Sequence, residues 1–133
     1  MTDDYTKFDS LKGVYLEDSY VLEISESPGK LEFRLYAVLT PDSPLYKPPK
    51  PDAQYCYARG KLEFENVSRI VWDERSFQQY RDATGEVDYG NIDSLITYEG
   101  SYRVEGDWGS VRIWSAYPPV FHTDENSAVD SVQ

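Results

Sequence analysis

The sequence predicts a mainly β fold, an antiparallel meander that forms a barrel or half-barrel with at most one or two short helical turns. Alternation is the first reason, because apolar residues recur at every second position in 20–24 and 31–39, with charged residues between several of them. Side chains of a pleated strand point to opposite faces in turn, so this period is typical of a strand with one solvated face. The second reason is a series of short turn sequences with no strand–helix–strand rhythm, which indicates successive hairpins curled so that their edges are protected.

The first hairpin is expected to follow a loose leader, residues 1–13, which contains a turn of helix. Strands are expected at 14–16 and 20–25, and the segment Ser27-Pro28-Gly29-Lys30 is typical of a tight turn. Proline fixes φ at one turn position and glycine accepts a positive φ at the next. The partner strand is 31–39. Equal spacing predicts one shared core face, formed by Tyr20, Leu22, Ile24, Leu31, Phe33 and Leu35.

A proline-rich connector and a second pair of strands come next. Five prolines lie within residues 41–51 and predict an extended loop, because each removes a backbone donor and fixes φ. The following strand, 54–65, carries small residues on its apolar face, and Gly60 there indicates a bend or a close approach of another segment. A hairpin is expected to join it to a strand at 67–72.

The second half of the chain is expected to contain one long polar loop and three more strands. Residues 73–80 fit a short capped helix or an irregular loop, and 82–93 form a loop with two glycines and little apolar content. Strands are predicted at 94–98, 102–105 and 110–114, separated by glycine-containing turns. We therefore expect a single domain over residues 14–121 and a disordered acidic tail over 122–133.

The net charge of −11 is concentrated in one region. Seven acidic residues lie between positions 82 and 107, with Arg103 as the one base among them: Asp82, Glu86, Asp88, Asp93, Glu99, Glu105 and Asp107. Such a surface repels phosphate backbones, which argues against a nucleic-acid partner, and attracts a basic protein. The alternative is that the charge only keeps the protein soluble.

The composition also predicts the compartment. No run of about eighteen apolar residues is present, and the acidic amino terminus is unlike a secretory signal, so we expect no membrane contact and a cytoplasmic location. The single cysteine allows no internal disulfide, which is consistent with a reducing compartment.

No catalytic constellation is visible in the sequence, so we expect a protein that is not an enzyme and uses no cofactor or metal. His122 and Cys56 are each the single residue of their type, which excludes the usual zinc sites within one chain. We interpret Cys56 as a small core residue and His122 as a solvated residue of the tail. Two carboxylate alternatives remain: a calcium site in 82–93, and a hydrolase whose tryptophans would bind sugar.

The residues of the acidic loop carry a resemblance. The run from Asp82 to Ser94, followed by Glu105-Gly106-Asp107-Trp108-Gly109, resembles a group of small uncharacterised bacterial β-proteins, over roughly residues 14–117. This resemblance implies no activity. In size, charge and lack of a catalytic site the chain is also similar to the immunity proteins of polymorphic toxin systems. That similarity implies a small, cytoplasmic, non-catalytic domain that neutralises a basic nuclease by binding it.

These observations predict a non-catalytic acidic binding domain with a basic protein partner. The expected contact residues supply charge and an aromatic anchor: Asp82, Glu86, Asp88, Tyr89, Asp93 and Asp107. The first alternative is a carrier that holds a small ligand in a β-barrel, and the second is the carboxylate-based hydrolase.

Overall fold

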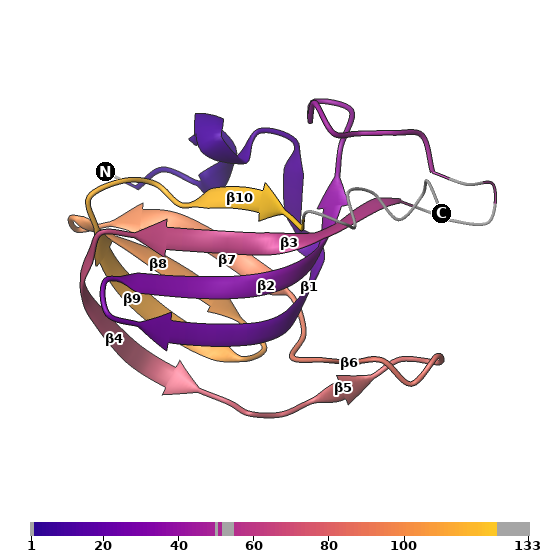
Figure 1. Cartoon of the computed structure of the whole chain (residues 1–133). Helices are drawn as coiled ribbons and strands as arrows, with labels where there is room; N and C mark the ends of the chain where they lie inside the picture. The colour runs from indigo at the N-terminus through magenta and orange to yellow at the C-terminus, as the bar shows by residue number, and fades with distance from the viewer. Residues whose placement is uncertain (1, 50, 52–54, 125–133) are drawn as a thin grey trace.

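Two antiparallel sheets and one short hairpin make up the strands of the computed structural model, which describes residues 2–49, 51 and 55–124 (Figure 1). The first sheet has the order β1-β2-β3-β10, with bounds Val14–Ser27, Lys30–Leu39, Cys56–Glu65 and Val120–Thr123. The second has the order β4-β9-β8-β7, with bounds Val67–Arg75, Gly109–Ser115, Ser101–Gly106 and Ile92–Tyr98. Strands β5 (Tyr80–Arg81) and β6 (Val87–Asp88) pair with each other beyond the sheets.

The predicted mainly β, antiparallel fold is confirmed. In the described residues the sheets do not close into a barrel, and the arrangement is compatible with a half-barrel or sandwich. The helical content there is two 3₁₀ turns, η1 (Tyr5–Lys7) and η2 (Asp9–Leu11). No helix in this part of the chain is long and apolar enough to cross a membrane.

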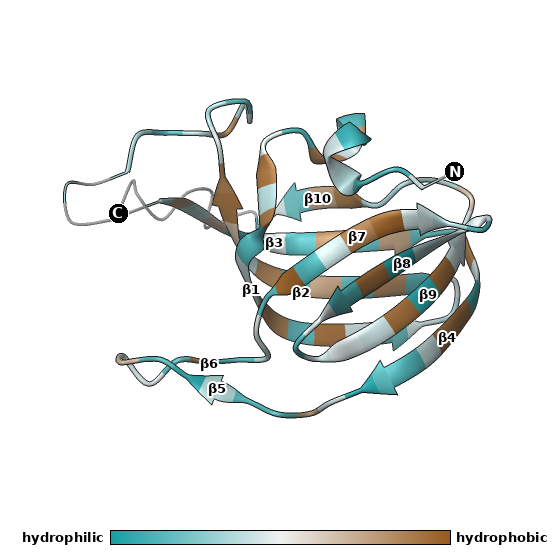
Figure 2. Ribbon diagram, turned by 180° about the vertical axis from the view of Figure 1, so that it is seen from behind, coloured by the Kyte–Doolittle hydropathy of each residue, from teal (hydrophilic) through white to brown (hydrophobic). Residues whose placement is uncertain are grey.

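One aromatic core lies between the sheets. Apolar and polar residues alternate along the strands, and the apolar faces of both sheets contribute to a single buried cluster (Figure 2). The Trp108 ring is fully buried, with its centroid 5.0 Å from that of Phe33 and 5.8 Å from that of Trp72. Cys56 belongs to the same cluster, which confirms its interpretation as a core residue.

Several of the predicted turns are confirmed. The pairing of Ser27 with Lys30 leaves Pro28 and Gly29 as a two-residue turn between β1 and β2. Tyr98 pairs with Ser101 around Glu99 and Gly100, and Gly106 pairs with Gly109 around the next turn. The close approach at Gly60 is confirmed as well, because a Cβ there would lie 2.3 Å from the carbonyl oxygen of His122.

The predicted core face of β1 is wrong for Tyr20 and Leu22, which line a groove on the outer face, whereas Ile24 packs against the core. Between the pairs Tyr15–Val38 and Tyr20–Tyr36, β1 advances five residues while β2 advances two, and a further irregularity follows Val21. The hydroxyl of Ser19 occupies the first irregularity, where it accepts from the Val38 N–H at 2.9 Å and donates to the Tyr15 carbonyl at 2.7 Å. The extra residues reverse the alternation, so Val21 is buried and Tyr20 is exposed.

The chain crosses between sheets where a hairpin was expected. Strand β4 follows β3 after one residue, Asn66, but pairs with β9 of the other sheet. Asn66 adopts a positive φ of 54°, which turns the chain across the edge of the core. The segment 73–80 contains no helix: β4 continues through Arg75, and an extended stretch leads to β5.

The two ends of the domain differ from the prediction. The segment 1–13 is not a loose leader, because Tyr5 and Leu11 are buried in the core and Asp4 bridges to Ile96 of β7. At the other end, β10 continues past the expected boundary at residue 121, and His122 pairs with Lys61 of β3. Its side chain is exposed and lies 3.7 Å from the carboxylate of Glu63. The rest of the expected tail, 125–133, lies outside the described residues.

Candidate binding site

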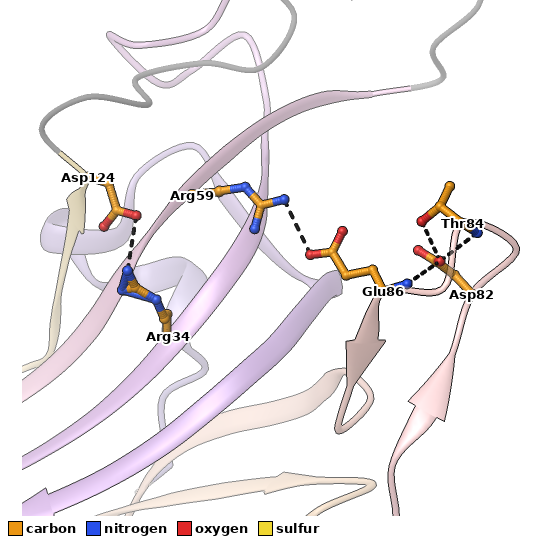
Figure 3. A network of polar contacts seen from close by, with 6 residues as sticks. All are labelled: Arg34, Arg59, Asp82, Thr84, Glu86 and Asp124. Carbon is orange, nitrogen blue, oxygen red and sulfur yellow. Dashed lines mark hydrogen bonds and ion pairs between the residues drawn. The ribbon is translucent and has the colours of Figure 1, made fainter.

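The β5–β6 hairpin extends beyond the ends of both sheets and is organised by one carboxylate (Figures 1 and 3). The Oδ1 atom of Asp82 accepts from the Thr84 hydroxyl at 2.6 Å, the Thr84 N–H at 2.9 Å and the Glu86 N–H at 3.0 Å. The bond from the Thr84 hydroxyl is the main reason that the pKa of Asp82 is lowered, and the two backbone donors contribute further. The Asp82 side chain therefore adds three hydrogen bonds to a turn that is also held by backbone bonds between Asp82 and both Gly85 and Glu86.

Replacing Asp82 with alanine is expected to loosen the tip of the hairpin without unfolding the sheets. The amides of Thr84 and Glu86 lose their acceptor, so their hydrogen exchange is expected to become roughly fivefold faster. Asparagine at the same position keeps an oxygen acceptor and should restore most of the protection. Equal exchange in all three proteins would show that the turn does not depend on this side chain.

The base of the hairpin is attached to β1 by backbone hydrogen bonds. The Val21 N–H donates to the Gly90 carbonyl and the Tyr89 N–H donates to the Val21 carbonyl, both at 2.8 Å. The carboxylate of Asp88 accepts from the Gly90 N–H at 2.7 Å. Tyr89 itself is half-buried and packs against the core, while its hydroxyl accepts from the side chain of Gln79. The hairpin thus has a fixed base at the edge of the first sheet.

Three tyrosines on the outer face of the first sheet lie opposite this hairpin; we refer to Tyr20, Tyr36 and Tyr57 as the tyrosine patch. The rings of Tyr36 and Tyr57 stack with centroids 4.6 Å apart and planes within 7° of parallel, and Tyr20 pairs with Tyr36 across β1 and β2. Burial, with smaller effects from Tyr20 and Asp18, raises the pKa of Tyr57 above its ordinary value.

A groove of about 250 Å³ separates the tyrosine patch from the hairpin. Leu22 forms part of its floor, and the carboxylates on its hairpin side are those of Asp82, Glu86 and Asp88. One wall is therefore aromatic and the other is anionic. This combination suits a cation, because an aromatic face and a carboxylate both attract positive charge.

An arginine of the protein already connects the two walls. The guanidinium of Arg59, on β3, lies 4.8 Å from the centroid of the Tyr36 ring and 3.3 Å from the carboxylate of Glu86. Figure 3 shows Arg59 reaching from the sheet toward the hairpin at this point. Both partners of this ion pair are partly exposed, so solvent screens it and the pair does not lock the hairpin in place.

A second groove, of about 280 Å³, adjoins the first. Asp82, Asp88 and Tyr20 line both grooves, and Asp107 from the β8–β9 turn joins them in the second. The carboxylate of Asp107 accepts from the Asn91 N–H at 3.2 Å. Partial burial, together with Asp107, Glu105 and Glu17, raises the pKa of the nearby Asp93. Three acidic residues of the hairpin and of the β8–β9 turn therefore line this groove together with one base, Arg81.

The structure brings four of the six predicted contact residues to the walls of these grooves. Asp82, Glu86, Asp88 and Asp107 line the grooves, and Asp93 lies near Asp107. Tyr89, expected as the aromatic anchor, packs inward instead. Sequence reasoning missed the tyrosine patch and Arg59. A signal was present for Tyr36 and Tyr57, which occupy the polar-face positions of strands whose apolar face was correctly predicted.

Two of the carboxylates considered for calcium accept hydrogen bonds within the hairpin, Asp82 from Thr84 and Glu86 and Asp88 from Gly90. Across 2–49, 51 and 55–124, no three side chains of the His, Cys, Asp and Glu types are grouped so that they could hold a metal ion.

Comparison of the chain with protein-family models, with curated proteins and with solved structures found no match.

Proposed function

We propose that this protein is a non-catalytic binding domain that docks a basic protein surface against the β5–β6 hairpin and the tyrosine patch. The single observation that supports this most directly is the pair of adjoining surface grooves that are both lined by Asp82, Asp88 and Tyr20, the first of them also by Tyr36, Tyr57 and Glu86. Tyrosine is among the residues enriched at the energetic centres of interfaces, and complementary charge speeds encounter and selects the partner.

The class of partner follows from the resemblance described above. Immunity proteins of polymorphic toxin systems neutralise basic nucleases, and the chain has their size and acidity. A basic nuclease in the cytoplasm is therefore the first partner class to test. The ligand-carrier alternative has less support, because Phe33, Phe64 and Trp108 occupy the interior and the two grooves lie on the surface.

The experiment uses a basic decapeptide of alternating lysine and arginine, and measures its affinity for the full chain by calorimetry at low and high salt. Neutralising Glu86 and Asp88 together (Glu86→Gln with Asp88→Asn) is expected to weaken binding about tenfold at low salt. Binding by the unmodified protein should weaken as salt rises, because the contact charges are exposed and screened over roughly 8 Å at physiological ionic strength.

The matched control is Asp3→Asn with Asp9→Asn, which makes the same change in net charge on the exposed amino-terminal segment. This pair is expected to change affinity less than about twofold, since remote surface charges are largely screened. If both pairs weaken the peptide equally, the protein attracts cations only through its overall charge, and the hairpin is not the contact surface. Absence of peptide binding at low salt would contradict the proposed function itself.

A further inference from the structure

We propose that the groove between the tyrosine patch and the hairpin is a receptor for one arginine side chain of the partner, and that Arg59, which contacts two of the residues lining this groove, competes with that arginine in the free protein. The inference rests on the proposed function and names the chemistry that the same site recognises. A general attraction between an acidic and a basic surface would not distinguish arginine from lysine, and it would give Arg59 no role in competition with the partner.

The contacts of Arg59 show that a guanidinium can bind to two residues that line this groove, Tyr36 and Glu86. Its guanidinium lies over the face of Tyr36 at 4.8 Å and beside the Glu86 carboxylate at 3.3 Å. A planar guanidinium can stack on an aromatic ring while its N–H groups donate to a carboxylate, whereas an ammonium acts as a compact point charge. The groove is therefore suited to arginine more than to lysine.

The size of the groove also favours a single side chain. At about 250 Å³ it lies below the range of about 300–1,000 Å³ that is usual for small-molecule pockets. The aromatic wall extends from Tyr36 to both sides, to the stacked ring of Tyr57 on β3 and to Tyr20 on β1. Opposite it, Asp88 offers a carboxylate in addition to the one that Arg59 uses. An incoming guanidinium can thus take the place of Arg59 at Glu86 or lie alongside it at Asp88.

Because Arg59 competes with the partner's arginine, removing its charge is expected to strengthen the binding of an arginine peptide. Arg59→Gln removes the internal cation and is expected to raise the affinity for the peptide acetyl-Gly-Arg-Gly-Arg-Gly-amide by roughly fivefold, as measured by titration in NMR. Peptides with lysine or with citrulline, the neutral counterpart of arginine, in place of both arginines should bind more weakly to the same variant. The shifted resonances should be those of the hairpin and of the tyrosine patch.

The chain supplies a matched control in Arg34. It lies on the outer face of the same sheet and makes a partly exposed ion pair at 3.5 Å with Asp124, which lines neither groove, whereas Arg59 contacts Tyr36 and Glu86 of the first groove (Figure 3). Arg34→Gln therefore makes the net charge more negative by the same amount as Arg59→Gln. It is expected to change the affinity for the arginine peptide less than about twofold.

A further variant tests the aromatic wall. Tyr57→Leu in the Arg59→Gln background should remove most of the gain in affinity for the arginine peptide, because the ring that stacks on Tyr36 is lost. Tyr57 is partly exposed on the outer face of the sheet. Circular dichroism reports whether the variant keeps its fold. Equal gains from Arg59→Gln and Arg34→Gln would overturn the inference, as would equal binding of the lysine peptide. Either result leaves the proposed function standing if the hairpin pair still weakens the basic decapeptide.

Discussion

Trp108→Ala is expected to lower the free energy of unfolding by about 3–5 kcal/mol, the range for deleting a large aromatic side chain from a core. Trp108 is fully buried although it lies in the two-residue turn between β8 and β9. Its ring contacts Phe33 of the opposite sheet, and its indole N–H donates to the Asn91 carbonyl at 3.1 Å. The substitution therefore opens a cavity between the sheets and leaves a partly buried carbonyl without its donor.

Urea unfolding followed by far-UV circular dichroism measures this effect, and Trp114→Ala is the control. Trp114 is half-buried on the outer face of the second sheet, with Arg69 and Arg112 stacked on it at 4.9 and 5.6 Å. Its loss is expected to cost about 1 kcal/mol, because exposed cation–π contacts are weak and no cavity forms. Similar costs for the two tryptophans would show that the space between the sheets is not filled as described.

The second large effect is expected at Gly13, where alanine should lower the free energy of unfolding by about 2–4 kcal/mol. Gly13 joins η2 to β1 with a φ of +81°, a region that disfavours side chains, and its carbonyl accepts from the Thr40 N–H at 2.8 Å. A Cβ at this position would lie 2.3 Å from the backbone nitrogen of Ser43. Relief of this clash requires the segment that buries Tyr5 and Leu11 to move away from the connector.

Gly29→Ala separates the clash from the backbone strain. Gly29 has a nearly equal φ of +77°, but nothing lies within 4 Å of the position that its Cβ would take. Its replacement is expected to cost about 1 kcal/mol through strain alone. If Gly13→Ala and Gly29→Ala cost the same in urea unfolding, the amino-terminal segment does not pack against the 40–43 turn in solution.

The strands were predictable from the sequence because their signals are local. The alternation over 31–39 and 56–64 reports which face of each strand is buried, and the turn at Pro28-Gly29 depends on two adjacent residues. The wrong predictions concern features that depend on residues far apart in the sequence. Which sheet β4 joins after Asn66 depends on contacts with β9, more than forty residues later in the chain.

The candidate site was predicted only on its acidic side. Charge is visible in the composition, so the hairpin carboxylates could be found from the sequence. The tyrosine patch requires the pairing of three strands, and Tyr20 reaches it only because β1 contains extra residues relative to β2. Nothing local distinguishes a strand with this irregularity from a regular one, and the regular alternation assigned Tyr20 to the core.

The irregularity in β1 separates two kinds of evolutionary constraint within one short stretch of chain. Val21 is fully buried, so its substitution is expected to disturb the core, whereas its neighbour Tyr20 faces outward and its substitution is expected to leave the core packing unchanged. The same division holds on β2 and β3, where Tyr36 and Tyr57 alternate with Ala37 and Ala58. Selection for a new partner can therefore act on one side of this sheet while purifying selection maintains the other.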